Sequence, residues 1–548
     1  MNESKEEPAR RLRVAFVGPI MQENLALQYL SAVVHERGHE HVLVGYDTRD
    51  DLGRAAKQIA ELEPDLVGIA VPFQFTISDA FAIAGSLRAH GCTAHITCGG
   101  HVPTFCYAEM LRDCEALDTV VRHEAEETIL EMLRHMENGE PLAHIDGLVW
   151  REEGEIVVAN RRHPVRHLDE ITPPLRPAEP YRVAGVPVAF IVTARGCIGE
   201  CDYCSIRAFG KDAGGAPFRL RAPEPVADEI ADLYHRAGAR VFFVQDDIFV
   251  LPSEKKTVER MDAITEGLAK RGVGKVAFWI KGRPETITPA VLEAAQRMGA
   301  IHMFMGIENA SAERLEYLGR LHKPHHNREA IALCRAHGVH PSFNFMLFDP
   351  DCSMDDVKIT LEFAETNLGM PYNFCRTEIY SGTGLLTRLA EQGRLQGDYL
   401  SYGYVMRDAR AELMFRILRV CFHERAFAFD SLLNKLISLS FARQIHQHFF
   451  PGPAMDRADR DVQSLIDEVH RDCFAMLWRV YDFAVSADLE DHAAMHELAV
   501  TMGLEASRRD LGWHARAQAL WDMFNITGVH RTGGPRDTGG TLRQPAWR

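Results

Sequence analysis

The amino-acid sequence lacks three features: an apolar run of membrane-spanning length, a secretory leader and an excess of positive charge. The N-terminal residues MNESKEEPARRLRVAFVG carry charges but no apolar run before a small-residue cleavage site, so we expect no signal peptide and a cytoplasmic protein. Lys and Arg number 61 against 77 Asp and Glu, a formal net charge of −16. A surface for nucleic acid or for an anionic membrane needs a basic face. We therefore expect neither nucleic acid nor a membrane as a partner.

Paired Cys-x2-Cys knuckles, which usually build closed zinc sites, are also missing. Twelve cysteines are present, and three of them, Cys197, Cys201 and Cys204, stand together in RGCIGECDYCSIR. A four-iron four-sulfur cluster held by only three thiolates leaves one iron open to another ligand. The alternative is a zinc ion completed by a distant fourth ligand. The other nine are scattered singly, and we expect them to be small buried core residues: Cys92, Cys98, Cys106, Cys114, Cys334, Cys352, Cys375, Cys421 and Cys473.

Strands and helices alternate along the first part of the chain. Residues 13–18, RVAFVG, predict a buried parallel strand, and NLALQYLSAVVHERGHE after them has helical periodicity. The alternation continues through ETILEMLRHMENG and predicts a doubly wound, Rossmann-like α/β domain over 1–148. A β-hairpin, IDGLVWREEGEIVVANRR, and the proline-rich ITPPLRPAEP then predict a linker over 149–185, because that run cannot continue a helix or a central strand.

A second alternating block follows the linker. Its strands are VAFIVTA, RVFFVQDD, KVAFWIKGR, IHMFMGIEN, PSFNFMLFD and FCRTEIYSG. Six βα units, against eight in a full barrel, predict a partial (βα)6 TIM-like barrel over 186–400 whose strand ends carry the site. From about residue 400 the strand signal disappears, and AELMFRILRVCFHERAF indicates a helical C-terminal domain over 401–527. We expect residues 528–548 to form a disordered tail.

The C-x3-C-x2-C spacing, directly after a strand in the first βα loop of this block, resembles the signature of the radical S-adenosylmethionine (SAM) superfamily. The resemblance implies that the three cysteines hold a four-iron four-sulfur cluster, that SAM chelates the open iron, and that one electron cleaves SAM to a 5′-deoxyadenosyl radical. It also implies SAM contacts at successive strand ends: Tyr203 at the adenine, Asp246 and Asp247 at the amino group, Lys281 or Arg283 at the carboxylate, and Glu308 at the ribose. The turn IYSGTGL resembles the family's closing turn. Taken alone, the two aspartates also fit helix N-caps, and the other charges fit a solvated surface.

The domain ahead of this block resembles the cobalamin-binding domain of the cobalamin-dependent branch of that superfamily. The matching segments are PDLVGIAVPFQFTISDA, TCGGHVPTF and DTVVRHEAEETILEM, and with the core the resemblance covers about residues 12–400. It implies that cobalamin approaches the backbone of Gly99 and Gly100, where no side chain intervenes. Thr76 and Ser78 are candidate donors to the corrin amides, although each also fits an ordinary helix cap.

One motif of classical cobalamin domains is absent. The loop VGPIMQEN contains no D-x-H-x-x-G, the motif that supplies the lower axial histidine. The resemblance therefore implies cobalt without a protein imidazole, its lower face covered by residues near Phe73, Gln74 and Phe75. His101 is an outside candidate for the axial ligand.

The combined resemblance implies an enzyme that methylates an unactivated carbon of a small-molecule or peptide natural-product intermediate. In that chemistry the radical removes a hydrogen, the substrate radical takes a methyl group from methylcobalamin, and a second SAM restores that methyl group. The alternatives are a cobalamin-dependent radical SAM cyclase or rearrangement enzyme, and a radical SAM enzyme that does not use cobalamin. A non-catalytic iron–sulfur or zinc protein is the alternative from a different class.

Two partner surfaces are also predicted. A flavodoxin or ferredoxin type reductant is implied. The segment 195–221 holds five basic residues against three acidic ones, which fits either a positive rim for such an acidic carrier or charges that simply solvate the loop. The basic residues are Arg195, Arg207, Lys211, Arg219 and Arg221. We expect substrate selectivity in the helical C-terminal domain, including Tyr402, Tyr404 and Arg407.

Overall fold

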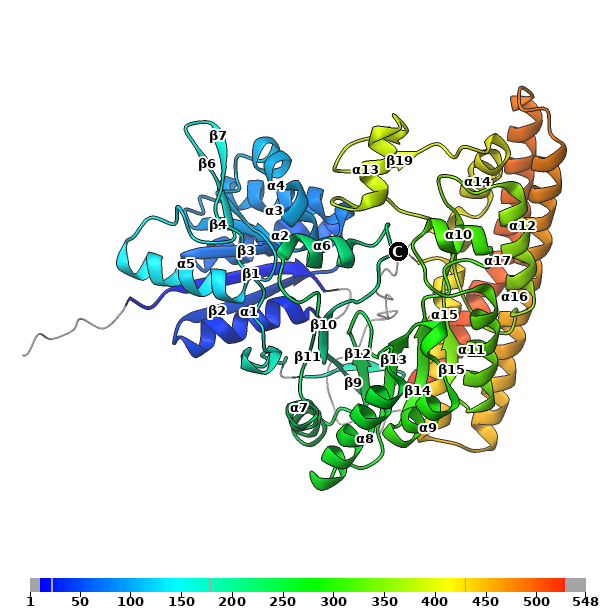
Figure 1. The fold of residues 1–548 in the computed structure, drawn as a ribbon, viewed down its shortest axis with the longest axis horizontal. Coiled ribbons are helices and arrows are strands. Elements are labelled where there is room, and N and C mark those ends of the chain that lie inside the picture. The colour runs from blue at the N-terminus through cyan, green and yellow to red at the C-terminus, as the bar shows by residue number, and fades with distance from the viewer. Residues whose placement is uncertain (1–9, 21–22, 178, 429, 528–548) are drawn as a thin grey trace, which may run out of the picture.

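The computed structural model describes residues 10–20, 23–177, 179–428 and 430–527, so the predicted tail over 528–548 lies outside the described residues. The chain forms three regions side by side (Figure 1): a first α/β domain in blue and cyan, a mainly green core, and a helical region in yellow to red. The core lies between the other two regions. Both predicted α/β blocks and the helical C-terminal region are present, as expected from the sequence.

The first domain is built on a seven-stranded sheet with the order β2-β1-β3-β4-β5-β6-β7, in which β1 to β5 are parallel. The order reverses direction at β1 and β3, and open sheets of this kind bind ligands at the carboxyl ends of such strands. The strands are β1 (Arg13–Pro19), β2 (Glu40–Tyr46), β3 (Leu66–Ala70), β4 (His95–Gly99), β5 (Thr119–Val121), β6 (Leu148–Glu152) and β7 (Glu155–Val158).

Helices cover both faces of this sheet, because its parallel strands are apolar on both sides. One face carries α1 and α5, which pack on each other, and α2 packs on α3. The helices are α1 (Leu25–Glu36), α2 (Leu52–Glu61), α3 (Ile77–Ala89), α4 (His101–Asp113) and α5 (Glu126–Asn138). The hairpin β6–β7, which we assigned to the linker over 149–185, instead extends the first sheet, since β6 pairs antiparallel with β5.

The core contains a six-stranded sheet with the order β15-β14-β13-β12-β9-β8, parallel except for the edge strand β8. The fifth predicted unit is broken into two strands, β15 and β16, and the last strand β17 pairs with β16. A single bridge from Glu308 to Phe345 connects the end of β14 to β16, so the strands follow one another around an incomplete barrel. The strands are β8 (Tyr181–Val183), β9 (Val186–Ile191), β12 (Val241–Val244), β13 (Ala277–Gly282), β14 (Ala300–Met305), β15 (His340–Ser342), β16 (Phe345–Phe348) and β17 (Phe374–Arg376).

Helices between these strands form the outer layer of the core, and they are α7 (Pro223–Arg236), α8 (Glu254–Lys270), α9 (Pro289–Met298), α10 (Ala312–Tyr317), α11 (Pro324–Ala336) and α12 (Met354–Glu365). The loop after β9 carries its own small elements: β10 (Ala194–Gly196), α6 (Ser205–Ala213) and β11 (Phe218–Leu220), with β10 and β11 antiparallel. After β17 come α13 (Gly384–Glu391), β18 (Leu395–Gln396) and β19 (Gly403–Tyr404). Short turns of helix complete these regions: η1 (Arg49–Asp51), η2 (Gln74–Thr76), η3 (Leu168–Glu170) and η4 (Pro284–Thr286).

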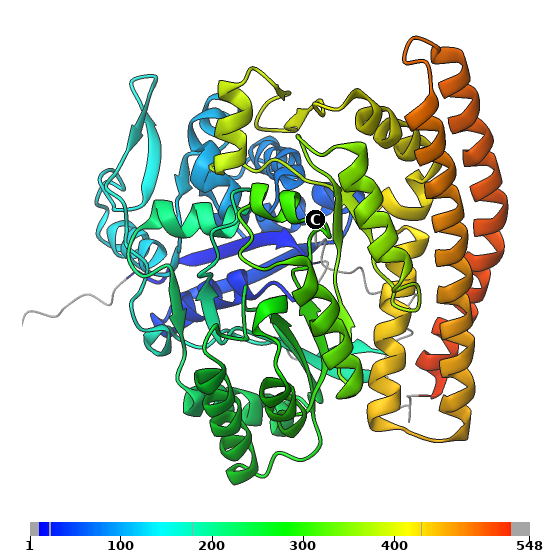
Figure 2. The same cartoon turned by 45° about the vertical axis from the view of Figure 1, so that its right-hand side comes forward.

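The C-terminal region is a bundle in which α17 packs against α14, α15 and α16 (Figure 2). Its helices are α14 (Ala409–Cys421), α15 (Leu432–Phe449), α16 (Pro453–Ser486) and α17 (His492–Thr527), with a π-helical turn over His423–Phe427. Helix α15 covers the open side of the barrel, where the ring of Phe441 lies 4.9 Å from that of Phe243. Among the described residues no helix combines the length and the apolar character needed to cross a bilayer.

Candidate active site

The three clustered cysteines occupy the loop between β10 and α6, at the carboxyl end of the first barrel strand. Gly196 precedes the loop with φ of +84°, and a Cβ there would lie 2.1 Å from the carbonyl oxygen of Pro217, so only glycine fits. Gly199 lies between the cysteines: a Cβ at that position would be 3.4 Å from Cys197 Sγ and 3.8 Å from Cys201 Sγ. Its backbone N–H donates to Cys197 Sγ at 3.3 Å. Glycine at position 199 therefore leaves the space beside both thiols free of a side chain.

The cysteine loop offers three thiols, the number that a four-iron cluster with one open iron requires. Among the described residues no group of three or more His, Cys, Asp or Glu side chains is arranged to hold a single metal ion. Burial raises the pKa of the Cys197 thiol and raises that of Cys204 to about 12. An iron ligand is held as thiolate, so cluster binding would reverse both shifts.

Arg320 and Glu308 lie beside the cluster loop, and Arg320 was missed by the sequence analysis. Arg320 Nη1 donates to Cys201 Sγ at 3.3 Å and lies 3.6 Å from Glu308 Oε1. Glu308 lies three residues after β14 and has φ of +63°, a left-handed conformation that is costly for a residue with a side chain. A Cβ at Gly306 would lie 2.7 Å from Arg320 Nη2 and 2.8 Å from Glu308 Oε1. The chain thus stores local strain to hold this carboxylate at the strand end.

The buried phenol of Tyr203 completes this group. Burial, and next the carboxylate of Glu308, raise the pKa of Tyr203 well above its usual value, while the guanidinium of Arg320 opposes the shift. The charges of Glu308 and Arg320, which lie beside Cys201, thus also act on Tyr203.

Asp246 and Asp247, equivalent in the sequence, have different surroundings. Asp246 is 1% exposed, and its carboxylate accepts the backbone N–H groups of Thr193 at 2.6 Å and Ala194 at 2.9 Å, and also the Thr193 hydroxyl. Its oxygens are thus committed to the β9–β10 connection. Asp247 accepts one bond, from Gly196 N at 3.2 Å, and lines a cavity. Burial raises the pKa of each to about 6. The structure places Asp247, and not Asp246, where a ligand can reach it.

Lys281 and Arg283 end β13 near the cluster loop. Burial lowers the pKa of Lys281 to about 8, against the opposing effect of Asp247 and then Asp246. Arg283 Nε lies 2.7 Å from Glu285 Oε1, and its Nη1 lies 3.3 Å from the position of a Cβ on Gly199. Its buried Nη2 has no hydrogen-bond partner among the described residues. A buried guanidinium with an unused N–H, next to the cluster loop, fits the carboxylate of SAM.

The predicted closing turn connects the cluster loop to the first domain. A Cβ at Gly384 would lie 1.8 Å from Asp202 Oδ1, so the turn packs tightly on the residue after Cys201. Ser381 Oγ lies 2.9 Å from Cys106 Sγ of the first domain. A Cβ at Gly382 would lie 2.3 Å from the ring of Phe105. These contacts fix the core against the carboxyl edge of the first sheet.

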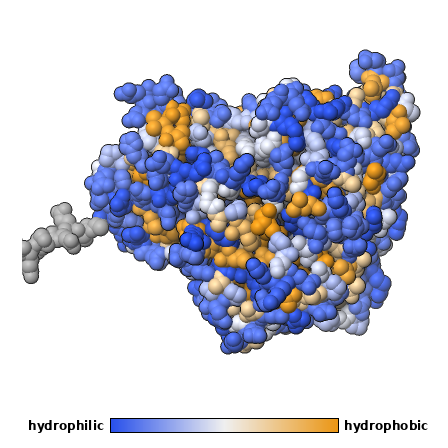
Figure 3. Space-filling model, viewed as in Figure 1, coloured by the Kyte–Doolittle hydropathy of each residue, from blue (hydrophilic) through white to orange (hydrophobic). Residues whose placement is uncertain are grey.

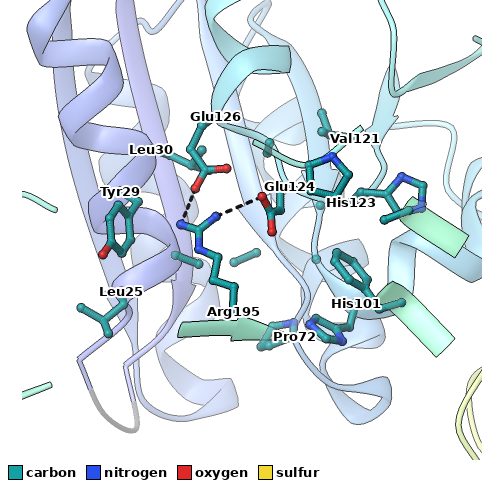
Figure 4. A pocket seen from close by; sticks show the side chains of 18 of the residues that line it. Leu25, Tyr29, Leu30, Pro72, His101, Val121, His123, Glu124, Glu126 and Arg195 are labelled. Carbon is teal, nitrogen blue, oxygen red and sulfur yellow. Dashed lines mark hydrogen bonds and ion pairs between the residues drawn. The ribbon is translucent and has the colours of Figure 1, made fainter. Parts of the chain in front are cut away.

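A cavity of about 390 Å³ lies where these two domains meet (Figure 4). Its lining includes Gly99, Gly100 and His101 of the first domain together with Gly196 and Asp247 of the core. In the space-filling view apolar surface gathers near the middle of the visible face (Figure 3). The cavity thus opens to both the predicted cobalamin segment and the cluster loop.

Different contacts determine the backbone at the glycine pair and the position of the histidine in this cavity. Gly100 has φ of +129°, and a Cβ there would lie 2.7 Å from the carbonyl oxygen of Val71, whereas a Cβ on Gly99 would make ordinary contacts. The ring of His101 stacks on Phe209 of α6 with centroids 4.3 Å apart. Burial lowers the pKa of His101 to about 4, so the ring is neutral at pH 7.

Ion pairs near the domain junction show that the positive rim predicted over 195–221 does not form as expected. Arg195 Nη2 lies 2.7 Å from Glu126 Oε1 and Nη1 lies 3.4 Å from Glu124 Oε2, so the guanidinium points between the two carboxylates (Figure 4). Arg219 also pairs with Glu124. Arg221 pairs with Glu229 and Asp169. These three arginines are largely buried and ion-paired, so the expectation of a five-residue positive rim is wrong. Of the five, Arg207 pairs with the exposed Glu200 and Lys211 is exposed.

The remaining first-domain candidates divide into two sets. Phe73, Gln74 and Phe75 line a second cavity, and the two phenyl rings stack with centroids 5.4 Å apart. Gln74 Nε2 donates to the carbonyl oxygen of Tyr399 at 2.7 Å. Thr76 and Ser78 line neither of the two cavities: Thr76 Oγ donates to the Phe73 carbonyl at 2.6 Å, and Ser78 Oγ accepts from Arg49 at 2.6 Å. Thr76 thus makes a local helix contact, and Ser78 contacts Arg49 of η1.

The second cavity has a volume of about 710 Å³ and is enclosed by all three regions of the chain. Tyr402 and Tyr404 line it, as do residues 373–380, which contain the last barrel strand β17. Arg407, the third residue predicted for selectivity, lies elsewhere, in an ion pair with Asp351 at 3.2 Å.

Comparison with known proteins identifies both α/β domains. The B12 binding domain family matches residues 16–133, and the Radical SAM superfamily matches residues 191–364. The chain is 28% identical over 366 residues to an uncharacterised methyltransferase of Pyrococcus horikoshii, covering 66% of this chain and 77% of the relative. It is 27% identical over 337 residues to the anaerobic magnesium-protoporphyrin IX monomethyl ester cyclase of Rubrivivax gelatinosus, covering 58% of each.

A solved structure extends the likeness to the whole fold. The cobalamin-dependent S-adenosylmethionine radical enzyme OxsB, with aqua-cobalamin bound, covers 94% of this chain and 80% of its own, with a TM-score of 0.68 and 17% identity. The two family matches confirm the predicted pair of domains, and with them cobalamin, SAM and the four-iron cluster as the cofactors.

Proposed function

We propose that this chain, a cobalamin-dependent radical SAM enzyme, transfers a methyl group to an unactivated carbon of a small-molecule or peptide intermediate. The observation that carries the proposal is the shared cavity: Gly100 and His101 of the B12-binding domain line the same space as Gly196 and Asp247 of the radical SAM domain. A methyl donor and a radical source must act on one substrate carbon, so their sites must face each other. The methyltransferase relative of Pyrococcus horikoshii supports the choice of reaction.

Each residue of the core then has a proposed task. Cys197, Cys201 and Cys204 would hold the cluster, whose reduced form supplies the electron that splits SAM. Arg283 would bind the SAM carboxylate through its unpartnered Nη2, and Asp247 would accept the SAM amino group from the cavity wall. Lys281 would lie close enough to Asp247 to keep that carboxylate charged, because a nearby cation opposes the effect of burial.

The strand end at Glu308 has a positioning partner. Glu308 would accept the ribose hydroxyls of SAM, and Arg320 would hold that carboxylate while donating to Cys201 Sγ. The same guanidinium thus contacts the cluster ligand and the nucleoside ligand, so it couples their positions. Asp246 would act only through the backbone of the β9–β10 connection.

The cobalamin side is built from backbone and apolar groups. Gly99 and Gly100 would let the cofactor approach the end of β4, whereas Phe73 and Phe75 line the second cavity. With both cofactors bound, the cavity walls would limit the access of water to the junction, which protects a radical from side reactions.

Isotope labelling tests the reaction. The reduced, anaerobic enzyme receives its substrate and SAM with a deuterated methyl group, and mass spectrometry follows all products. Methyl transfer needs one SAM as radical source and one as methyl donor, so each turnover should release one 5′-deoxyadenosine and one S-adenosylhomocysteine, with deuterium in the product.

The cyclase of Rubrivivax gelatinosus supports a second candidate, ring formation. A cyclase needs no methyl donor. Unlabelled product, with 5′-deoxyadenosine accumulating and S-adenosylhomocysteine absent, would therefore favour the cyclase and reject the methyltransferase.

A further inference from the structure

The second cavity differs in character from the rest of this acidic protein. It is enclosed by the Phe73–Phe75 turn of the first domain, the end of β17, the segment 396–404 and the end of α14 with the π-helical turn. At about 710 Å³ it is large enough for a drug-sized ligand. The end of β17 belongs to the same barrel that carries the cluster loop, so this cavity adjoins both cofactor domains.

Basic side chains dominate its charged lining. Arg376, Arg419 and His423 contribute basic groups, and Glu378 contributes the carboxylate, which accepts the Tyr380 hydroxyl at 2.6 Å. Within the described part of the chain, no carboxylate lies at ion-pair distance from Arg376 or Arg419. In a chain with a net charge of −16, two guanidinium groups without a carboxylate partner in one cavity favour an anionic ligand.

Aromatic rings hold these guanidinium groups in place. The Arg376 guanidinium lies 3.5 Å from the ring centroid of Tyr404 and 4.9 Å from that of Phe415, and it donates to the Tyr404 carbonyl oxygen. The Arg419 guanidinium lies 6.0 Å from the same Phe415 ring. Both cations are thus arranged around one aromatic side chain. Guanidinium groups stacked on rings are pre-oriented, so less entropy is lost when they bind a planar anion.

Aromatic rings form part of the remaining walls, beside polar side chains such as Gln74 and Asn373. Phe73 and Phe75 stack with an interplanar angle of 9°, and Phe374, Phe427 and Tyr402 also line the space. Aromatic walls favour a ligand with a flat, apolar body, because stacking and burial both contribute.

We propose that this cavity binds one end of the substrate, away from the reacting carbon, and that this end carries a carboxylate or phosphate group on a flat, largely apolar body. The anionic group lies at Arg376 and Arg419, and the apolar body lies toward Phe73 and Phe75, on the side of the B12-binding domain. That this ligand is the substrate rests on the proposed function; that the cavity binds such an anion does not.

The binding test uses probes instead of the unidentified substrate. Isothermal titration calorimetry of the anaerobic holoenzyme compares 2-naphthoate and 2-naphthyl phosphate with the neutral 2-naphthamide, which has the same ring system. At least one anion should bind about tenfold or more tightly than the amide, since charge-assisted bonds add about 1.5–3 kcal/mol, and tenfold in affinity is about 1.4 kcal/mol. The stronger of the two anions identifies the natural head group.

Matched variants locate the effect. Arg376→Gln and Arg419→Gln should each remove most of the preference for the anion and leave binding of the amide unchanged. Arg416→Gln is the control, because Arg416 lies on the same helix, is exposed and pairs with Glu412 at 2.7 Å. It should bind all probes like the parent chain. Arg419 is on the surface of α14, so its variant should fold even if Arg376→Gln does not.

Three results would overturn the proposal: no binding of either anion, equal affinity for anion and amide, or an equal loss in Arg416→Gln. The outcome of the labelling experiment does not depend on the outcome of this binding test. Deuterium-free product would reject methyl transfer while anion binding persists, and loss of anion preference would reject this cavity's role while methyl transfer stands.

Discussion

Asp246 and Asp247 are adjacent in FVQDDIF, yet the structure predicts opposite consequences for their replacement. Asp246→Ala should destabilise the core, and Asp247→Ala should not. Alanine at Asp246 leaves three buried donors without an acceptor: the N–H groups of Thr193 and Ala194 and the Thr193 hydroxyl. Each unmet donor costs about 1–3 kcal/mol, so the gross loss is about 3–9 kcal/mol.

Burial of the Asp246 charge offsets part of that loss. Its pKa is raised to about 6 from a usual value near 4, so the charged form at pH 7 is disfavoured by about 3 kcal/mol. We therefore expect a net loss of about 3 kcal/mol for Asp246→Ala. Asp247 is exposed and accepts a single bond, at 3.2 Å, so Asp247→Ala should stay within about 1 kcal/mol of the parent chain.

The pH dependence has a definite sign. A carboxyl group with a raised pKa holds its proton more tightly in the folded chain than in the unfolded chain, so its stabilising contribution falls as the pH rises from about 4 to about 6. The loss caused by Asp246→Ala should accordingly be about 1 kcal/mol larger at pH 5 than at pH 7.

Urea denaturation followed by circular dichroism at pH 5 and pH 7 measures these differences. Asp247→Ala, although stable, should lose 5′-deoxyadenosine formation, whereas the folded fraction of Asp246→Ala should retain it. Equal destabilisation by the two variants, or a larger effect of Asp247→Ala, would refute the division of roles between them.

Two further predictions concern the domain junction and cobalt. Arg195→Gln leaves Glu126 without its buried cation and should cost about 2–3 kcal/mol in urea denaturation, against less than about 0.5 kcal/mol for the exposed pair broken by Arg236→Gln; equal effects would show that the junction is not held by this pair. Because the His101 ring stacks on Phe209, electron paramagnetic resonance of the cob(II)alamin form should show no nitrogen splitting; splitting that vanished in His101→Ala would instead identify His101 as the axial ligand.

The sequence predicts best those features that are local in the chain. The cluster cysteines lie within eight residues, and the strands of the core are short apolar runs, so spacing and periodicity suffice to find both. Gly100 can also be found from local sequence, because its neighbours Gly99 and His101 lie in the same turn. For such features the sequence alone identifies the residues that carry the chemistry.

Features that depend on distant contacts were missed or misread. Arg320 reaches Cys201 from 119 residues away and belongs to no motif. The charges of Arg195 and Arg219 suggested an exposed rim, because their partner Glu124 lies in another domain. The two aspartates of FVQDDIF could not be told apart, since only the fold decides which one meets the Thr193 backbone and which one meets the cavity.

The central claim is that one junction holds both a three-cysteine cluster and cobalamin. Metal analysis of the protein, reconstituted anaerobically with iron, sulfide and hydroxocobalamin, tests this claim most directly. The parent chain should bind about four irons and about one cobalt per chain. Cys197→Ala, Cys201→Ala and Cys204→Ala should each lose the cluster iron and keep cobalt, while Cys106→Ala and Cys334→Ala should keep both. Full iron after loss of any one of the three cysteines, or no cobalt in the parent chain, would contradict the account.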